Sequence, residues 1–426
     1  MLKNAETHFA RNKDWDEATT KQWSEANATA KVKLLADAKS PLAKLGHVER
    51  AGRILKQMTE AQAAFTTSLV AKDLGKPRTT RVLKRGEYDQ PQGDPLQPGV
   101  PQILGGLPED APRNRIGLAK WLTSRENPLV ARVLVNRIWQ RVFGAGLVRT
   151  PEDFGRQGQQ PTHPDLLDWL AVEMHDSGWN LKQMLKLMVT SQAFRQSSAW
   201  RKEIADPENR LFARGPGHRL DAEVIRDVGL WASGLLDPHM GGEGVKPYQP
   251  AGMWKALAHP GSNTKQYVAD KGERLYRRSL YVYWKRTSPH PMMILFDAPD
   301  RESSCVRRSR TSTAQQSLGL LNETQRIELS RKFAERLLKQ AESDDARFDL
   351  MFRLLASRAP SDDERAVCRT LLDFMKTRYA ASEKDALDLL ATGEAKRDES
   401  LKPTDVAAWT QVVVTVLASD VAILLY

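Results

Sequence analysis

The apolar residues between positions 127 and 144 recur at helical spacing, and this segment is the centre of the predicted fold. Asn127 suits the cap of a helix, Pro128 suits its first turn, and Gly144 suits its end. Between these signals, one broad face of the helix carries Ala131, Leu134, Val135, Ile138, Trp139 and Val142. A helix with so wide an apolar face packs against more than one neighbour, so we expect it to nucleate a core.

Residues 1–76 show sparser helical patterns. The segment from 14 to 72 predicts two amphipathic helices, with Ser40 and Pro41 as a fresh helix start. Because their apolar stripes hold few large side chains, we expect these helices to form no core of their own and to dock on another surface. The expected contacts are Trp15, Trp23 and Phe65. A remnant of an upstream domain is one interpretation of this segment.

Residues 77–112 separate the N-terminal helices from the rest of the chain. Residues 81–85 predict a short strand. Repeated proline and glycine between residues 89 and 112 forbid regular structure there and predict a linker. We therefore place a domain boundary in this segment.

Residues 113–426 predict a series of helices. Thr313 and Gln316 form a capping-box pair before one of them. The best strand signal in the sequence is Ser279–Trp284, which is rich in aromatic and β-branched residues. The predicted fold is therefore mainly α, a multi-helix domain with a small β element and an N-terminal helical appendage.

Charge and cysteine content narrow the function only slightly. The sequence has 64 Lys and Arg against 53 Asp and Glu, a formal charge of +11 that favours anionic partners but is modest for 426 residues. The densest basic run, at residues 307–310, is short, so nucleic-acid binding is the least favoured function. Whether Cys305 and Cys368 pair is left open. We expect no transmembrane segment, because the apolar stretch at residues 412–425 is short and contains Asp420.

Motifs for metals and cofactors are missing from the sequence. It contains no CxxCH, HExxH, P-loop, GxGxxG or GxSxG pattern, so we expect no metal site and no cofactor, covalent haem included. His163, between Thr162 and Pro164 and beside Asp165, has two interpretations. It is either a general base or metal ligand, or a residue that helps to cap the helix starting at Pro164 or is exposed to water.

Polar residues within the central helix are the first candidates for a binding site. Burying Arg132, Asn136 or Arg137 is costly unless their hydrogen bonds are satisfied. These residues either anchor the following loop, which contains Glu152 and Asp153, or bind an anionic ligand.

A second polar group lies at residues 297–310. Acidic and basic residues alternate there at short spacing, which indicates an ion-pair network, with paired catalytic carboxylates as the alternative. The candidate binding cluster from the sequence comprises Arg132, Asn136, Arg137, Glu152, Asp153, His163, Arg307, Arg308 and Arg310. No catalytic residue is predicted.

Several short motifs, in order along the chain, resemble one family. They include Val135-Asn136-Arg137-Ile138-Trp139, Glu152-Asp153-Phe154-Gly155, Leu167-Asp168-Trp169-Leu170, Phe296-Asp297-Ala298-Pro299 and Arg307-Arg308-Ser309-Arg310-Thr311. Together they resemble the planctomycete-type domain of unknown function 1553. The resemblance implies an exported, multi-domain protein in which this domain follows a c-type cytochrome domain, and it brings no established catalytic residues. Because this sequence shows neither CxxCH nor a signal peptide, its localisation is left open and a cytochrome c domain is expected only as a partner.

Three functions from different classes fit these observations. The leading one is a non-catalytic scaffold or interaction module of an exported, cytochrome-associated assembly. The second is a hydrolase or binding protein for acidic or sulfated glycans, and the third is nucleic-acid binding. A deep pocket that gathers ionisable groups would favour the enzyme, and a flat apolar patch the module. Convergence of Arg132, Asn136 and His163 on one pocket would be the most informative observation.

Overall fold

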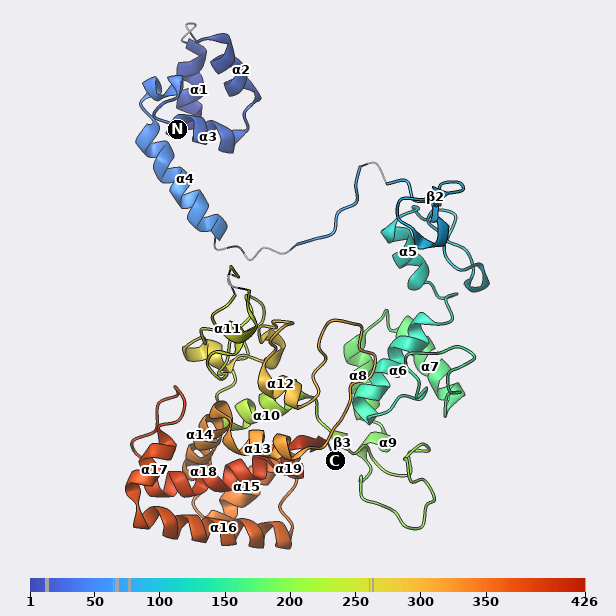
Figure 1. Ribbon diagram of the computed structural model, residues 1–426, viewed down its shortest axis with the longest axis vertical. Coiled ribbons are helices and arrows are strands. Elements are labelled where there is room, and N and C mark those ends of the chain that lie inside the picture. Colours follow the sequence, from blue (N-terminus) through green and yellow to red (C-terminus); the bar gives the residue numbers. More distant parts are fainter. Residues whose placement is uncertain are drawn as a thin grey trace. The chain divides into compact units, whose positions relative to one another are not determined.

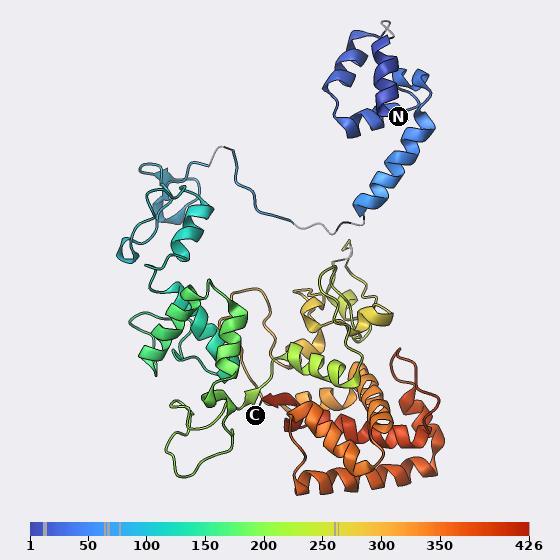
Figure 2. The ribbon, with the colours of Figure 1, turned by 180° about the vertical axis from the view of Figure 1, so that it is seen from behind.

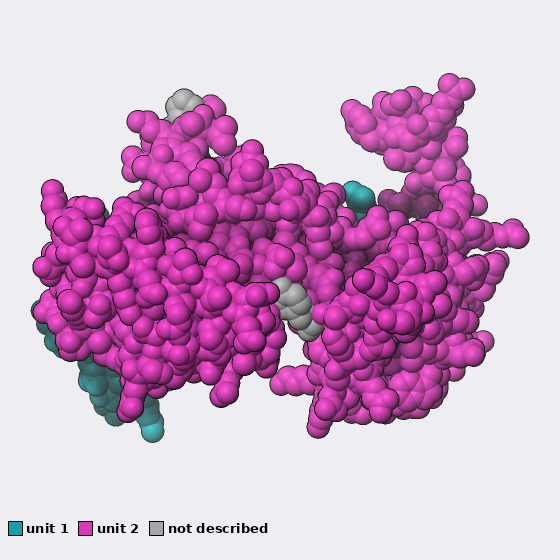
Figure 3. Space-filling view, turned by 90° about the horizontal axis from the view of Figure 1, so that it is seen from below, with its two compact units in different colours: residues 1–78 teal, residues 79–426 magenta. Residues whose placement is uncertain are grey.

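Helices form most of the protein, as Figures 1 and 2 show from opposite sides. The computed structural model describes residues 1–11, 15–63, 65, 69–75, 78–259, 261–262 and 264–425. The strands of these residues form two small two-stranded sheets, which confirms the predicted mainly α fold with a small β element. The chain divides into two compact units, a first unit of residues 1–78 and a second unit of residues 79–426 (Figure 3). No helix among the described residues has the length and apolar character needed to cross a membrane.

The described residues of the first unit form four α-helices where two were predicted. They are α1 (Leu2–Arg11), α2 (Glu17–Glu25), α3 (Ala28–Ala36) and α4 (Val48–Ala63), with the 3-10 turn η1 (Pro41–Leu45) before α4. Asp16 and Asn27 cap α2 and α3, because each side chain accepts a hydrogen bond from a backbone N–H of the first turn. Leu35 and Leu42 are buried in a core made by this unit's own residues.

This core shows that the expectation of coreless N-terminal helices is wrong. The prediction considered one apolar stripe per helix, whereas the core joins aromatic rings from separate segments. The ring centroid of Phe9 lies 5.2 Å from that of Trp15 and 5.3 Å from that of Trp23. Stacked rings bury large apolar areas with few residues. Trp15 and Trp23 therefore pack inside the first unit, while Phe65 is exposed.

The second unit begins with a short hairpin and one helix. Its elements are β1 (Val82–Leu83), η2 (Lys84–Gly86), β2 (Pro91–Gln92), η3 (Gln102–Leu104) and α5 (Arg115–Leu122). The strand predicted at residues 81–85 is present with only two residues, and it pairs antiparallel with β2. The expectation that residues 89–112 contain no regular structure is therefore wrong. Pro91 is tolerated in β2 because both strands of a two-stranded sheet are edges.

The central helix is α6 (Val130–Phe143), which packs against α7 (Pro164–Asp176) and α8 (Leu181–Val189), with α9 (Gln192–Arg195) next along the chain. Figures 1 and 2 show α6, α7 and α8 side by side. The predicted apolar face is buried, with Val135 and Trp139 in a core shared with α7 and α8. The helix begins later than predicted, because Asn127 accepts hydrogen bonds from the N–H groups of Leu129 and Val130 and so closes a turn before the helix.

The chain continues through shorter elements. They are β3 (His218–Arg219), α10 (Ala222–Ser233), α11 (Met253–Leu257), η4 (Gly272–Tyr276), η5 (Ser279–Tyr281) and α12 (Pro291–Leu295). The strand predicted at Ser279–Trp284 is wrong, because its first half is η5 and Val282 forms only an isolated bridge with Val245. High β propensity yields a strand only where a neighbouring strand offers a ladder of hydrogen bonds.

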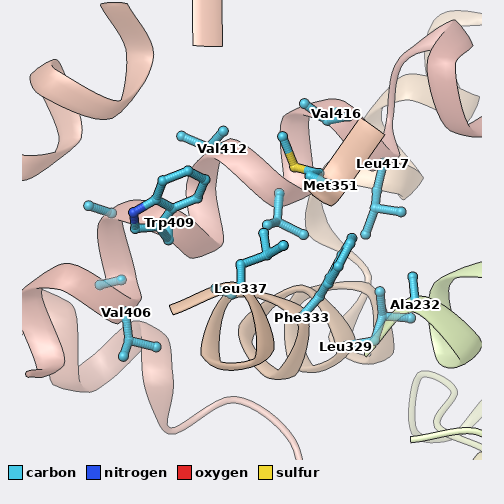
Figure 4. Close-up of a cluster of buried hydrophobic side chains, with 14 of the residues drawn as sticks. Ala232, Leu329, Phe333, Leu337, Met351, Val406, Trp409, Val412, Val416 and Leu417 are labelled. Atoms are coloured by element: carbon cyan, nitrogen blue, oxygen red, sulfur yellow. The ribbon is translucent and has the colours of Figure 1, made fainter. Parts of the chain in front are cut away.

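The C-terminal part is a helical bundle around a buried helix. It contains α13 (Ala314–Asn322), α14 (Thr324–Gln340), α15 (Asp344–Ala356), α16 (Asp362–Ala381), α17 (Glu383–Leu390), α18 (Pro403–Leu417), α19 (Asp420–Ile423) and β4 (Leu424–Leu425). The capping box predicted at Thr313 is confirmed at the start of α13. The helix α18 packs against α14, α16 and α17. Figure 4 shows Phe333 and Leu337 of α14 in one core with Trp409 and Val412 of α18.

Candidate functional site

The polar residues predicted in α6 have separate environments. Arg132 pairs with Asp168 of α7 at 2.6 Å, and Arg137 is exposed. Asn136 is fully buried, and its side chain donates to the carbonyl of Val148 at 3.0 Å and accepts from the N–H of Val148 at 2.9 Å. Asn136 therefore anchors the segment that follows α6, which is the structural interpretation of this residue.

His163 and Asp153 make local contacts. Nδ1 of His163 lies 3.0 Å from Oγ1 of Thr162, the ring centroid of His163 lies 5.2 Å from that of Phe212, and its side chain does not cap α7. Asp153 accepts a hydrogen bond from the N–H of Gly155 at 2.6 Å and so closes its own turn. These residues therefore do not join the polar side chains of α6 in one pocket.

A cavity of about 330 Å³ lies beside the C-terminal end of α6. Its walls come from the end of α6 and the turn after it, from the segment between α9 and β3, and from the segment between α12 and α13. Among the described residues of its lining, one is acidic, Glu208, and four are arginines: Arg149, Arg210, Arg214 and Arg310. We call it the arginine cavity. Such an excess of guanidinium groups attracts anions.

The loop from Asp206 to Arg214 supplies two of these arginines. Asp206 is buried and accepts hydrogen bonds from the N–H groups of Arg210, Leu211 and Ala213 at 2.7, 2.8 and 3.4 Å. Burial opposes ionisation of Asp206, but these N–H groups and the nearby Arg214 hold its pKa below the ordinary value. An ionised Asp206 therefore fixes the backbone that carries the arginines.

The same loop has a strained backbone. Asn209 and Phe212 have φ values of 52° and 57°, in the left-handed region, which asparagine tolerates but a bulky residue such as Phe212 rarely adopts. The side chain of Asn209 donates to the carbonyl of Arg214 at 2.9 Å and accepts from its N–H at 3.1 Å. A strained backbone persists only where surrounding contacts hold it in place, and such strain is found most often at functional sites. The loop is thus a pre-organised wall of the cavity.

Two of the cavity arginines are oriented by this loop. Arg149 donates to the backbone carbonyl of Glu208 at 2.8 Å and to its carboxylate at 3.3 Å. Arg214 donates to the backbone carbonyls of Asp206 and Pro207, both at 2.9 Å. A hydrogen bond to a carbonyl orients a guanidinium without cancelling its charge. The cavity therefore keeps an excess of positive charge.

The segment between α12 and α13, residues 296–313, carries another arginine to the cavity, and we call it the arm. Asp297, near its start, pairs with Arg219 of β3 at 2.5 Å. Arg308 donates to both carboxylate oxygens of Glu223 in α10, at 2.6 and 3.1 Å. These two ion pairs hold the arm against β3 and α10, which follow the loop that carries Arg210 and Arg214.

Arg310 of the arm is a cation without a carboxylate partner among the described residues. Its guanidinium donates to the backbone carbonyl of Gly144 at 3.3 Å. Partial burial lowers the pKa of Arg310; Asp221 opposes this shift, and Arg141 and Arg219 reinforce it. A cation placed near other cations is stabilised by an anionic ligand.

His218 lies against Gly144, the residue that ends α6. Gly144 has a φ of 87°, and a Cβ added there would lie 2.8 Å from Nδ1 of His218. Burial, reinforced by Arg310, lowers the pKa of His218 to about 4, so its imidazole is neutral at pH 7. Nδ1 has no hydrogen-bond partner in the part of the chain that the structure describes. β4 pairs antiparallel with β3, which places His218 opposite Leu425.

Two further cavities follow the arginine cavity, and only the first of them shares lining residues with it. One, of about 550 Å³, shares Gly144 and Arg149 with it, and the other, of about 570 Å³, shares Glu152 and Arg307 with the second. We call the three cavities together the groove. Four residues of the cluster predicted from the sequence line the groove: Glu152, Arg307, Arg308 and Arg310. Within the described ranges, no group of three His, Cys, Asp or Glu side chains is placed to hold a metal ion.

The other groove residues were not predicted from the sequence. Arg149, Arg210, Arg214 and His218 stand apart from any motif or basic run. The available signal was the Asp-Pro-Glu-Asn segment at residues 206–209, whose composition is typical of an ordered turn. Such a turn indicates a fixed loop and says nothing of what the loop binds.

The structure is thus that of a mainly α protein with an arginine-lined cavity at the end of its central helix. Residues 114–372 match the family model PSD1, described as a protein of unknown function (DUF1553). The match covers more than half of the chain, so the protein belongs to this family, and the resemblance noted from the sequence is confirmed. A search of curated proteins and a search of solved structures found no match.

Proposed function

We propose that this protein is a non-catalytic interaction module that binds an anionic group of its partner in the arginine cavity. The observation that carries the proposal is the set of four arginines around one cavity whose described lining holds a single glutamate. Guanidinium groups bind carboxylate, sulfate and phosphate through paired, charge-assisted hydrogen bonds. Ala145 and Gly146 also line the cavity, and their N–H groups, which donate to no acceptor among the described residues, are available as further donors.

Binding fits the lining of this cavity better than glycoside hydrolysis does. Hydrolysis of a glycosidic bond uses two carboxyl groups on either side of that bond. The described lining of the arginine cavity offers one, Glu208, whose carboxylate lies 3.3 Å from Arg149 and 4.0 Å from Arg210. An acidic or sulfated glycan, considered from the sequence as a hydrolase substrate or a bound ligand, would here be a ligand.

The assembly served by such a module belongs to the same proposal. Its support is the resemblance described above, which implies an exported assembly that contains a cytochrome c domain. In that arrangement the arginine cavity would hold an acidic group of a neighbouring protein or glycan.

Calorimetric titration of the full chain with sodium sulfate, against sodium chloride at equal ionic strength, tests the proposal. Arg310→Ala should weaken sulfate binding roughly tenfold to a hundredfold, because a hydrogen bond to a charged group contributes about 1.5–3 kcal/mol. Arg137→Ala is the matched control, since it removes an exposed arginine of α6 that does not line the groove. Absence of sulfate binding, or equal losses in the two variants, would refute the site.

A further inference from the structure

The charge of the groove changes sign along its length. The arginine cavity has four arginines against one glutamate, the second cavity has three arginines against two glutamates, and the third has two arginines against three acidic residues. In the third cavity, Arg308 is paired with Glu223. Asp297 is likewise paired with Arg219. The charged side chains left to meet a ligand there are Glu152, Asp300 and Arg307.

This gradient discriminates between classes of ligand. A polymer that is anionic throughout would be attracted at the arginine cavity and repelled by Glu152 and Asp300 at the other end. A ligand with one anionic terminus and a basic body would be attracted along the whole groove. We infer that the groove binds the C-terminal segment of a partner polypeptide, with the free carboxylate in the arginine cavity and a basic residue near Asp300; this rests on the proposed function and specifies its ligand.

The lining of the arginine cavity suits the end of a peptide. Arginines combined with free backbone N–H groups, here those of Ala145 and Gly146, form a recurring receptor for C-terminal carboxylates. Phe143 and Phe212 line the same cavity, with ring centroids 5.5 Å apart in an edge-on arrangement. These rings offer apolar surface to the last side chain of the peptide. The terminal residue of the partner should therefore be apolar.

The rest of the groove suits the residues before that end. The second and third cavities have volumes of about 550 and 570 Å³, far more than one anionic group occupies. Ser303, Ser304 and Ser309 line the third cavity, and hydroxyl groups both donate to and accept from a peptide backbone. The groove therefore accommodates an extended chain that runs from the arginine cavity toward Asp300.

Fluorescence anisotropy with the full chain and a labelled peptide, Lys-Lys-Ser-Gly-Ser-Leu, tests the inference. Amidation of the C-terminus removes the carboxylate charge and should weaken binding at least roughly tenfold. Exchange of both lysines for glutamates should weaken it roughly threefold or more. Equal binding of the acid and the amide would overturn the inference, and so would tighter binding of a sulfated hexasaccharide than of the lysine peptide.

A charge-reversal variant tests the direction of the peptide. Glu152→Lys should reverse the preference between the lysine and glutamate peptides, since Glu152 is exposed in the groove. Glu399→Lys makes the same charge change at an exposed position outside the groove and should leave the preference as it was. If Arg310→Ala weakens sulfate binding as expected while amidation has no effect, the peptide is the wrong ligand and the anion site stands. If sulfate does not bind at all, both proposals fail.

Discussion

Replacing Asn136 by alanine should loosen the segment that leads from α6 into the arginine cavity. Asn136 is fully buried and makes two hydrogen bonds with the backbone of Val148, at 3.0 and 2.9 Å. Alanine would leave the N–H and the carbonyl of Val148 buried without partners, at a cost of about 1–3 kcal/mol for each group. The expected loss of unfolding free energy is therefore about 2–6 kcal/mol. Because Arg149 follows Val148 directly, sulfate binding should weaken as well.

Hydrogen–deuterium exchange at the N–H of Val148 measures the local effect, and urea unfolding measures the global one. A loss of about 2 kcal/mol corresponds to roughly thirtyfold faster exchange, since 1.4 kcal/mol is a factor of ten. Arg137→Ala, at the next position but exposed, should stay within about 0.5 kcal/mol of the unaltered protein. Unchanged exchange at Val148 together with an unchanged urea midpoint would show that Asn136 does not anchor this segment.

Three other properties follow from buried groups. Burial lowers the pKa of His218 to about 4, and that of His290, the buried residue before α12, likewise to about 4. The unfolded chain therefore takes up their protons first as the pH falls. Unfolding free energy should therefore drop between about pH 6.5 and pH 4, by about 3 kcal/mol per histidine, and a flat series of melting temperatures would contradict this. Cys305 is exposed, whereas Cys368 is buried with its pKa raised to about 11, so a thiol reagent should label only Cys305 in the native protein. Mass spectrometry of the labelled peptides checks this, and early labelling of Cys368 would count against it. Residues 1–78 have their own core, so this segment alone should melt cooperatively by circular dichroism, and Trp23→Ala should cost about 3–5 kcal/mol; a gradual melt of the unaltered segment would contradict that core.

Helical periodicity predicted much of the architecture because its determinants are local. The apolar face of α6 and the capping box at Thr313 each depend on residues within a few turns, and both are present. The core of the first unit depends instead on Phe9 meeting Trp23 of another helix, which no periodicity encodes. The segment Ser279–Trp284 shows the same limit, because its β propensity lacked a neighbouring strand.

The candidate site was harder to predict than the fold. Arg307 and Arg310 were predicted as site residues because they lie in a basic run. Arg149, Arg210 and Arg214 are single residues in a sequence with 64 Lys and Arg, and each alone resembles any surface arginine. They differ from other surface arginines only because the fold brings them to one cavity. This depends on the strained loop after α9 and on the contact of the arm with the end of α6.

The pairing of β3 with β4 has a consequence for how the site comes into being. It joins His218, a wall of the arginine cavity, to Leu425, far along the chain. Pairings over such sequence separations form slowly, because closing so long a loop costs entropy before the new contacts offset it. During synthesis, Arg149 and Arg214 are added to the chain well before the arm and β4. A nascent chain would therefore contain these arginines before the cavity can form. Anion binding would then be a property that the second unit gains only on completing its fold, and sulfate affinity would serve as a measure of that completion.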